Sequence, residues 1–315
     1  KEASSLVRAG YEVAYVCNGT AAPAADERGV RVIGLSMPRS RIRRMTAGPG
    51  MTVRAAFELQ PEAVHVFDPA LIGPALRLGR KKHISVVVDL PEEYARQILQ
   101  KRYLGPMIIR RIASAVFRVV SRVQLPQAAL VVAATPAIAG TLSPRCRSII
   151  VRNYAVLPEV DAVLPVSLPL PLSGPRSLRL VYVGGMSRIR GIADMVAAVG
   201  LLDGKAELHL AGPLYESRLL EEVSSLQGWQ FCRYHGVLNW SSSIALVKAC
   251  DVGVCMLSPA PNHVQALPVK VFEYMACSRP SIVSSFSLWR SLFAGSALFA
   301  APDDPEGLAR AVRVL

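Results

Sequence analysis

Short apolar runs alternate with stretches of helical periodicity along the whole chain. This alternation is typical of α/β proteins, in which helices cover both faces of a sheet of buried parallel strands. The runs predict strands in the first half at residues 12–17, 30–35, 63–67, 83–88, 130–133 and 149–151. In the second half they predict strands at residues 178–183, 206–211, 230–234, 251–256 and 280–283, and a helix at 192–202. The two halves share one pattern, which predicts two Rossmann-like domains.

A proline-rich stretch, residues 156–177, separates the two halves. It contains Pro158, Pro165, Pro169, Pro171, Gly174 and Pro175. Because proline has no backbone N–H and resists continuation of a helix, no regular element is expected there. We therefore predict a linker and a domain boundary near residue 165, which gives domains 1–164 and 165–315.

Both ends of the chain lie in predicted helices. Residues 2–9 form a helical stretch closed by Gly10, and an amphipathic helix begins at Pro305 without a capping signal before Leu315. There is no signal-peptide pattern in the sequence given. We expect an N-terminal strand and part of a C-terminal helix to lie outside it.

Composition excludes several classes of protein. Hydrophobic residues make up 51% of the 315 residues and charged residues 19%, with a mean hydropathy of +0.33, so the chain is not generally disordered. Its longest weakly polar stretch, residues 128–142, is shorter than the roughly 20 residues of a membrane-spanning helix and contains Pro136. The six cysteines form no CxxC pair, which argues against a zinc site and a disulfide framework and favours a reducing, cytoplasmic location.

Positive charge is concentrated in the first half. Residues 1–155 contain 23 basic and 10 acidic residues, whereas residues 156–315 contain 13 of each. Within residues 96–122, apolar side chains are interleaved with Arg96, Lys101, Arg102, Arg110, Arg111, Arg118 and Arg122. This pattern is typical of a helix that lies on anionic lipid, and equally of a core helix with a basic solvated face. Nucleic acid is the least favoured partner, because no recognised motif accompanies the charge.

The stretch LVYVGGMSRIRGIADMVAAV, residues 180–199, predicts an anion site. An apolar strand runs into Gly184 and Gly185, and a helix follows near Gly191. In such a turn, free backbone N–H groups and the helix dipole point at the ligand, and glycine lets a phosphate approach the backbone. Arg188 and Arg190 add positive charge beside the turn, which suits a diphosphate.

A second stretch, ALPVKVFEYMACSRPSIVSS at residues 266–285, places a carboxylate in a mostly apolar helix. Pro268 is expected as the first helical residue, and the helix carries Lys270 and Glu273. A buried carboxylate needs partners, so Glu273 is expected to accept hydrogen bonds from ligand hydroxyls, from Lys270 or from nearby backbone.

Together these stretches resemble the C-terminal half of the bacterial glycosyltransferase family 4, a group of GT-B enzymes. The first half adds matching segments: HVFDPAL at 65–71, VVDLPEEYARQIL at 87–99, ALVVAATPAIA at 129–139 and VRNYAVLPEV at 151–160. The resemblance implies two Rossmann-like domains that face a central cleft, with the donor bound by the C-terminal domain and the acceptor by the N-terminal one. It also implies an anomer-retaining, metal-independent sugar transfer from a nucleotide diphosphate sugar, with no other cofactor.

The resemblance assigns roles to particular residues. Gly184 and Gly185 match the glycines beside the diphosphate, Arg190 the phosphate-binding base, and Arg188 a helper. Glu273 matches the last glutamate of the family's E-x7-E motif, which in relatives holds the ribose hydroxyls. A further set is expected to bind the donor: Gln265, Lys270, His235 and Val237, the last two in the loop that faces the nucleobase.

Three positions depart from the family pattern. Phe67 and Pro91 stand where relatives often have histidine, and Gln265 stands where the E-x7-E motif has its first glutamate. The departures leave open a non-catalytic subunit that binds nucleotide, and, ranked below it, a sugar-nucleotide epimerase of the same architecture. The favoured prediction is a cytoplasmic glycosyltransferase of glycolipid or cell-surface polysaccharide synthesis, peripheral on an anionic membrane, with a lipid-linked or saccharide acceptor.

Overall fold

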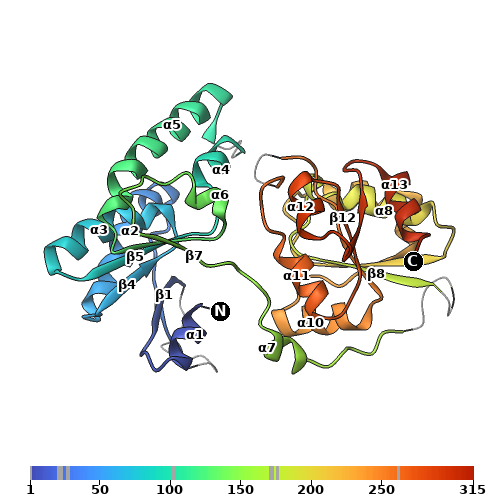
Figure 1. Ribbon diagram of the computed structural model, residues 1–315, viewed down its shortest axis with the longest axis horizontal. Coiled ribbons are helices and arrows are strands. Elements are labelled where there is room, and N and C mark those ends of the chain that lie inside the picture. The colour runs from blue at the N-terminus through green and yellow to red at the C-terminus, as the bar shows by residue number, and fades with distance from the viewer. Residues whose placement is uncertain are drawn as a thin grey trace. The chain divides into compact units, whose positions relative to one another are not determined.

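The chain folds into two compact units, Lys1–Arg152 and Asn153–Leu315, called unit 1 and unit 2 below. The structure, a computed structural model, describes residues 2–19, 24–25, 29–100, 104–169, 174, 177–260 and 263–315 (Figure 1). The division lies between Arg152 and Asn153, before α7 (Leu157–Asp161), whereas the sequence suggested a boundary near residue 165. Val160 of α7 is fully buried in a core of unit 2, so this helix belongs to unit 2.

Unit 2 contains a parallel sheet whose strand order reverses at its centre. Among the described residues the order is β10-β9-β8-β11-β12-β13. The strands are β8 (Leu178–Val183), β9 (Ala206–Ala211), β10 (Cys232–Tyr234), β11 (Val252–Cys255), β12 (Ser281–Ser284) and β13 (Ala297–Ala300). From β8 the chain adds strands on one side and from β11 on the other. In open α/β sheets, the carboxyl ends of the strands at such a switch point form the usual ligand crevice.

Helices cover both faces of this sheet, as Figure 1 shows. One core contains side chains of α8 (Ile192–Gly200), α9 (Leu219–Ser224) and α13 (Pro305–Val312). The opposite core contains side chains of α7, α10 (Trp240–Ala249), α11 (Val269–Ala276) and α12 (Ser287–Leu292). Successive strand residues serve opposite cores: Leu180 and Tyr182 point into the first and Val181 into the second. Short 3₁₀ turns, η3 (Arg188–Arg190) and η4 (Gln227–Phe231), follow β8 and precede β10.

Unit 1 contains two sheets among the described residues. The strands β1 (Ala14–Asn18), β3 (Arg31–Leu35) and β2 (Ala24–Ala25) form one sheet, with β2 antiparallel to β3. The other sheet is parallel, in the order β4 (Ala63–Val66), β5 (Ser85–Leu90), β6 (Leu130–Ala133) and β7 (Ser148–Ile150). β1 and β4 do not pair among the described residues, so the strands predicted for the first half lie in two sheets.

The helices of unit 1 are α1 (Glu2–Arg8), α2 (Arg41–Glu58), α3 (Pro69–Lys82), α4 (Tyr94–Gln100), α5 (Met107–Gln124), the 3₁₀ turn η2 (Leu125–Gln127) and α6 (Pro136–Ala139). The core under them combines β4, β5 and β6 with α2 and α3, through buried side chains such as Phe57, Leu76 and Val88. Asp68 caps α3 by accepting a hydrogen bond from the Ala70 amide at 2.8 Å, so the chain turns into a helix directly after β4.

Several predicted bounds need correction. The strands at 130–133, 178–183 and 206–211 are confirmed, but Gln230 and Phe231 lie in η4, and the strands β2 and β13 were not predicted. The linker was expected to hold no regular element, yet α7 forms there because Pro158 stands in the first helical turn, where its missing N–H costs nothing. Pro171 and Pro175 lie outside the described residues.

The basic segment predicted at residues 96–122 divides between two helices, α4 and α5; Lys101 and Arg102 lie outside the described residues. Ser114 is the buried residue of α5, whose apolar side chains are largely exposed. The described part of the chain has no helix that is both long and apolar enough to span a bilayer.

Candidate functional site

Two glycines form a tight turn at the carboxyl end of β8. Gly184 has φ +141°, a conformation that side chains disfavour, and its amide donates to the Ala211 carbonyl oxygen at 2.8 Å. The Tyr182 hydroxyl donates to the carbonyl oxygen of Gly185 at 2.8 Å and holds the turn. A Cβ atom on Gly185 would overlap the ring of Tyr215, which therefore covers this part of the turn. The glycines were predicted from the sequence, but Tyr215 was missed. Tyr215 is distant from Gly185 in the sequence, and the fold brings the two residues together.

Arg190 lies beside the same turn. Its Nη1 donates to the carbonyl oxygen of Gly185 at 3.2 Å, and its guanidinium carbon is 5.8 Å from the centroid of the Tyr215 ring. Gly191 follows in the left-handed conformation, φ +66°, where a Cβ atom would overlap the Met256 carbonyl. The chain then enters α8, as predicted, so a helix N-terminus and a guanidinium group both accompany the glycine turn.

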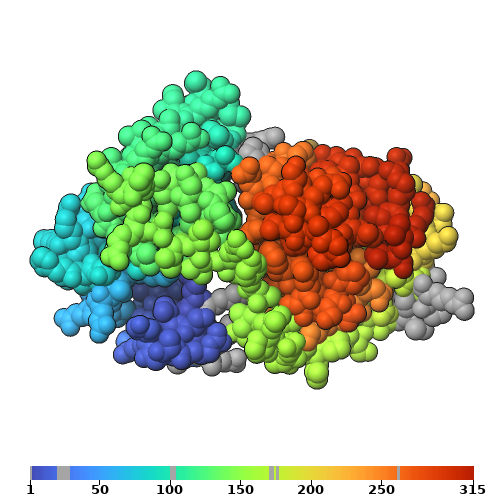
Figure 2. All heavy atoms as spheres, viewed as in Figure 1, coloured from blue at the N-terminus to red at the C-terminus, as the bar shows by residue number. Residues whose placement is uncertain are grey.

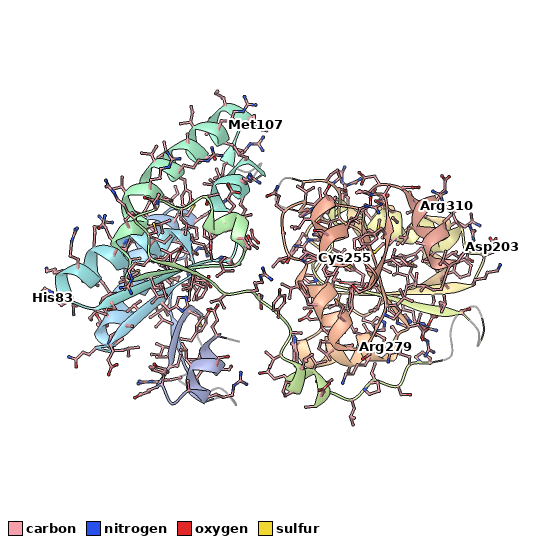
Figure 3. All side chains as sticks on the ribbon, viewed as in Figure 1. His83, Met107, Asp203, Cys255, Arg279 and Arg310 are labelled. Atoms are coloured by element: carbon pink, nitrogen blue, oxygen red, sulfur yellow. The ribbon has the colours of Figure 1, made fainter. Side chains whose placement is uncertain are left out.

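Lys270 brings a second cation to the turn from α11. Its Nζ lies 3.7 Å from the centroid of the Tyr182 ring, and a Cβ atom on Gly184 would lie 3.0 Å from it. The Nζ atom is buried and has no hydrogen-bond partner among the described residues. Burial raises the pKa of the Cys255 thiol, and Lys270 and Arg190 oppose part of that rise, so both cations act at the end of β11 (Figure 3 labels Cys255).

The phenol of Tyr274 positions α11 against the sheet. It is fully buried, donates to the Val254 carbonyl oxygen at 3.3 Å and accepts from the Val183 amide at 3.3 Å. A Cβ atom on Gly253 would overlap the Tyr274 ring, so glycine is required there for the helix to approach. Burial raises the pKa of this phenol well above its usual value, which keeps it neutral. The helix begins at Val269 with Pro268 as its N-cap, one residue later than predicted.

Glu273, on the same helix, is half-buried. The indole Nε1 of Trp240 donates to its Oε1 at 3.3 Å. Trp240 is the first residue of α10, where Asn239 caps the helix by accepting from the Ser242 amide at 2.8 Å. The sequence suggested ligand hydroxyls, Lys270 or backbone as partners of Glu273; the indole was missed because it lies 33 positions earlier in the chain.

Arg188 is held by carboxylates in this structure. Its guanidinium group pairs with Glu222, with Nη1 2.7 Å from Oε1, and with Glu216, with Nε 3.3 Å from Oε2. Its backbone amide also donates to Glu216 at 3.0 Å. The role of Arg188 as a helper to Arg190 stays a prediction.

The remaining predicted donor residues differ in their surroundings. Gln265 and Val237 are exposed, and Val237 has 70% of its surface accessible. His235 is half-buried at the end of β10, where its Nε2 lies 2.9 Å from Nδ1 of the buried His209. The sequence contains no signal for this contact, because His209 and Glu207 alternate with leucines and read as the polar face of a strand.

In unit 1, one polar residue from each of α1, β4 and β5 comes together. Ligand atoms of Glu2, His65 and Asp89 all lie within 4.8 Å of one another, a grouping that sequence reasoning missed. Burial, and secondly the charge of Glu2, raise the pKa of Asp89 to about 6. Phe67, one of the departures from the family pattern, stacks on Tyr15 with ring centroids 6.0 Å apart. No described contact involves Pro91.

A cavity of about 580 Å³ opens in unit 1 beside α4 and α5. Its walls combine apolar side chains, such as Phe117 and Ile138, with three arginines and two glutamates: Arg96, Arg118, Arg122, Glu92 and Glu93. Arg96 Nε is 2.8 Å from Glu93 Oε2, so part of this charge is paired. The mixture suits an amphiphilic group.

Comparison with known proteins gives consistent results for both units. The family model of glycosyl transferases group 1 matches residues 177–315, and that of the glycosyl transferase 4-like domain matches residues 2–158. Comparison with curated proteins finds no match.

Solved structures share the fold across nearly the whole chain. Sucrose-phosphate synthase from Thermosynechococcus elongatus is 17% identical with a TM-score of 0.74, covering 99% of this chain and 81% of that one. An E. coli structure described as trehalose-6-phosphate bound with UDP-2-fluoro glucose is 12% identical (TM-score 0.67; 98% and 86% covered). The Anabaena protein HepE in complex with UDP-glucose is also 12% identical (TM-score 0.64; 96% and 89% covered).

The two family models together account for most of the chain, and the solved structures have the same pair of Rossmann-like units. The chain therefore belongs to the glycosyl transferases group 1 and has the GT-B glycosyltransferase fold.

Proposed function

We propose that the protein transfers a sugar from a nucleoside-diphosphate sugar to an acceptor, with retention at the anomeric carbon and without a metal. The observation that carries the proposal is the buried ammonium group of Lys270, which lacks a hydrogen-bond partner among the described residues and faces the Gly184 turn. A buried charge is retained at a cost in stability, which a bound anion would offset. The structural neighbours described with UDP or a UDP-sugar support a diphosphate as that anion.

In this mechanism the donor's diphosphate lies against Gly184, beside Lys270, because the Tyr215 ring covers Gly185. Lys270 and Arg190 stabilise the negative charge that grows on the leaving diphosphate. These two side chains thus do what a bound metal ion does in metal-dependent transferases. Glu273 accepts hydrogen bonds from the ribose hydroxyls, with the Trp240 indole fixing its orientation. Gln265 provides an amide for the sugar hydroxyls.

A screen of donors tests the proposal. Uridine, guanosine and adenosine diphosphates would be added to the protein in thermal unfolding, and the corresponding diphosphate sugars would be tested for hydrolysis with and without EDTA. A ligand at 100 times its dissociation constant should add about 2.7 kcal/mol to the free energy of unfolding. Lys270→Ala should remove this gain, and Lys205→Ala, at the opposite end of β9, should keep it. Stabilisation by no nucleoside diphosphate would contradict the proposed function; binding without turnover would favour the non-catalytic subunit.

For the acceptor we propose a lipid-linked or saccharide molecule presented at an anionic membrane. The supporting feature is the outer face of α5, the α5 stripe, whose exposed apolar residues are Met107, Ile108, Ile109, Ile112, Val116, Val119, Val120 and Val123. Figure 2 shows atoms of α5 at the surface of unit 1, and Figure 3 labels Met107 at the start of the helix. The stripe is wide for a helix exposed to water, and such patches mark interaction sites.

Charge on α5 favours anionic lipid as the partner. At about 100° per residue, Arg111, Arg118 and Arg122 form a row along one side of the stripe, and α5 has no acidic residue. Apolar side chains flanked by arginines suit a helix lying in the interface of an anionic bilayer. The six cysteines are free thiols, which supports placement on the cytoplasmic side of such a membrane. The neighbouring cavity would then receive an amphiphilic acceptor.

A further inference from the structure

A chain of hydrogen bonds runs from a buried carboxylate to the edge of the proposed nucleotide site. Glu207 and His209 lie on the same side of β9, and both are fully buried. Glu207 Oε1 is 2.9 Å from His209 Nε2, and His209 Nδ1 is 2.9 Å from His235 Nε2. The two imidazole rings are nearly parallel, with an interplanar angle of 15° and centroids 5.1 Å apart.

Charge around Glu207 determines which nitrogen atoms carry protons. The side chains of Arg179 and Arg233 approach its two carboxylate oxygens, with Nε–Oε distances of 3.3 and 3.5 Å. Two guanidinium groups keep the carboxylate ionised, so it only accepts, and His209 Nε2 must donate to it. Burial, reinforced by both arginines, lowers the pKa of His209 and favours the neutral ring, although Glu207 opposes the shift. In a neutral ring Nδ1 is then an acceptor.

The protonation of His209 also determines which nitrogen of His235 carries a proton. Because His209 Nδ1 accepts, His235 Nε2 must donate, and the remaining lone pair of a neutral His235 is on Nδ1. Burial, and secondly the neighbouring His209 and Arg233, lower the pKa of His235, which favours the neutral form. His235 Nδ1 has no hydrogen-bond partner among the described residues, and it is not buried, so a ligand can reach it.

The position of His235 fits the far end of a nucleotide. The Gly236 carbonyl oxygen accepts from the Gly212 amide at 2.8 Å, and a Cβ atom on Gly212 would overlap the carbonyl of Gly184. The turns after β8, β9 and β10 therefore touch, and two strand spacings, roughly 10 Å, separate the diphosphate turn from His235. The loop that follows His235 leads into Trp240, the partner of Glu273. A ribose at Glu273 would thus direct its base toward this loop.

We propose that Glu207 and His209 hold His235 in the tautomer whose Nδ1 accepts a hydrogen bond from a ring N–H of the donor's nucleobase. Uracil and guanine carry such an N–H at the ring position in the middle of their pairing edge, whereas adenine has an acceptor nitrogen there and donates on that edge only through its exocyclic amino group. The chain of hydrogen bonds therefore favours a donor whose base has a ring N–H at that position, as uracil and guanine do, over an adenine-type donor. This inference rests on the proposed function. In it His235 contacts substrate, and Glu207 and His209 are positioning residues.

Nitrogen NMR of the histidine rings tests the tautomers without any ligand. Both His209 and His235 are expected to carry their proton on Nε2, with assignment by the variants His209→Gln and His235→Ala. A proton on Nδ1 of His235 in the neutral protein would overturn the inference.

Binding measurements test the hydrogen bond to the base. Calorimetry would compare uridine diphosphate with its N3-methyl derivative, which lacks the N–H, and with its C5-methyl derivative, which keeps it; guanosine diphosphate and its N1-methyl derivative form the parallel pair. The N-methyl group should weaken binding about tenfold in the wild type, the effect of one lost hydrogen bond. His235→Ala should weaken binding of the parent nucleotide similarly and abolish the discrimination. His83→Asn, at an exposed turn of unit 1, should leave both unchanged.

The binding results distinguish the hydrogen bond to the base from the proposed function. Tight binding of a nucleoside diphosphate without discrimination against the N-methyl form, or a preference for adenosine diphosphate, would overturn the inference and leave the proposed function standing. Discrimination that persists in His235→Ala would also overturn it. Binding of no nucleoside diphosphate at all would overturn both.

Discussion

The ammonium nitrogen of Lys270 lies 3.7 Å from the centroid of the Tyr182 ring, and the hydroxyl of that ring donates to the Gly185 carbonyl oxygen at 2.8 Å. One aromatic side chain thus supports both the glycine turn and the cation that faces it. The cation–π contact contributes up to about 2 kcal/mol when it is desolvated, which only partly offsets a buried ammonium group without hydrogen bonds.

Lys270→Met should therefore stabilise the protein in the absence of ligand and impair its function. We expect the free energy of unfolding of unit 2 to rise by about 1 kcal/mol, because an unpartnered buried donor is removed. The stabilisation by nucleoside diphosphate should be lost in the same variant. Tryptophan fluorescence in a denaturant titration measures both, since Trp229, Trp240 and Trp289 all lie in unit 2. Lys205→Met is the matched control; a destabilised Lys270→Met that still binds nucleotide would contradict the assignment.

Arg190 and Arg188 should differ in their effects on turnover. Arg190 lies against the Gly185 carbonyl, so Arg190→Ala should lower kcat about a hundredfold with a smaller change in KM, because leaving-group charge is greatest in the transition state. Arg188 is exposed and paired with Glu216 and Glu222, so Arg188→Ala should cost less than tenfold. Steady-state kinetics of donor hydrolysis compare them. Equal losses would show that Arg188 leaves its carboxylates to act on the donor.

Glu273→Gln should weaken donor binding without unfolding the protein. The amide keeps an oxygen for the Trp240 indole and loses the charge that favours two ribose hydroxyls. We expect about a tenfold loss of affinity for the diphosphate and a smaller loss for the 2′-deoxyribose analogue, measured by calorimetry. Unchanged affinity for both would remove Glu273 from the site. Trp240→Phe, which deletes only the indole donor, should show a smaller loss.

Recognition of the site from sequence depended on local features. The turn after β8 was predictable because an apolar strand, two glycines and two arginines follow one another, and the helix with Lys270 and Glu273 was marked by its proline start. Tyr215, Trp240 and the pair of Glu207 and His209 were not predictable, because each reaches the site from another strand or helix. Glu207 and His209 alternate with leucines in β9, which reads as one polar face of a strand, although both faces are buried.

The α5 stripe shows a second limit of sequence reasoning. Amphipathic periodicity predicts one apolar face and one polar face, and it left a core helix and a lipid-bound helix open. In the structure a third face packs inward, centred on Ser114, whose hydroxyl donates to the Ala95 carbonyl oxygen at 2.7 Å. A small polar residue at the packed face is the reverse of the usual pattern, so hydrophobicity alone could not identify that face.

Asp89 provides a pH-dependent prediction for unit 1. Burial, followed by the charge of Glu2, raises its pKa from 3.8 to about 6, so between these values the folded state binds the extra proton. The stabilising effect of the protonated form is complete below pH 4 and is lost as the pH rises through 6. The free energy of unfolding of Asp89→Asn, relative to that of the wild type, should therefore rise between pH 4 and 6.5. Above pH 6.5 the difference should stay constant.

Circular dichroism in a denaturant titration measures this difference. An unfolding transition that circular dichroism detects and tryptophan fluorescence does not is assigned to unit 1, because the tryptophans lie in unit 2. Asp203→Asn, at an exposed turn of unit 2, is the control and should show no such trend. A stability difference independent of pH would mean that Asp89 is ionised in the folded protein throughout this range.

The last prediction concerns attachment of α5 to membranes. Ile112, Val116 and Val119 are each more than half exposed, and replacing all three by serine should leave the fold intact while lowering co-sedimentation with vesicles that contain anionic lipid. Charge reversal of Arg111, Arg118 and Arg122 to Glu should have a similar effect, since each basic residue near an anionic surface contributes about 1 kcal/mol. Arg110 is left in place because it donates to the Leu99 carbonyl oxygen at 2.6 Å.

The control for charge reverses Arg77, Lys81 and Lys82 on α3, which changes the net charge equally on a helix without large exposed apolar residues. If the α5 stripe and its arginines act together, this control should retain most of the binding, whereas either α5 variant should lose it. Added salt should weaken wild-type binding, because charges are screened over about 8 Å at physiological ionic strength. Equal sedimentation with neutral and anionic vesicles, or equal loss in the α3 control, would mean that α5 is not the attachment site, and the basic surface of unit 1 would then be better explained by an anionic acceptor in solution.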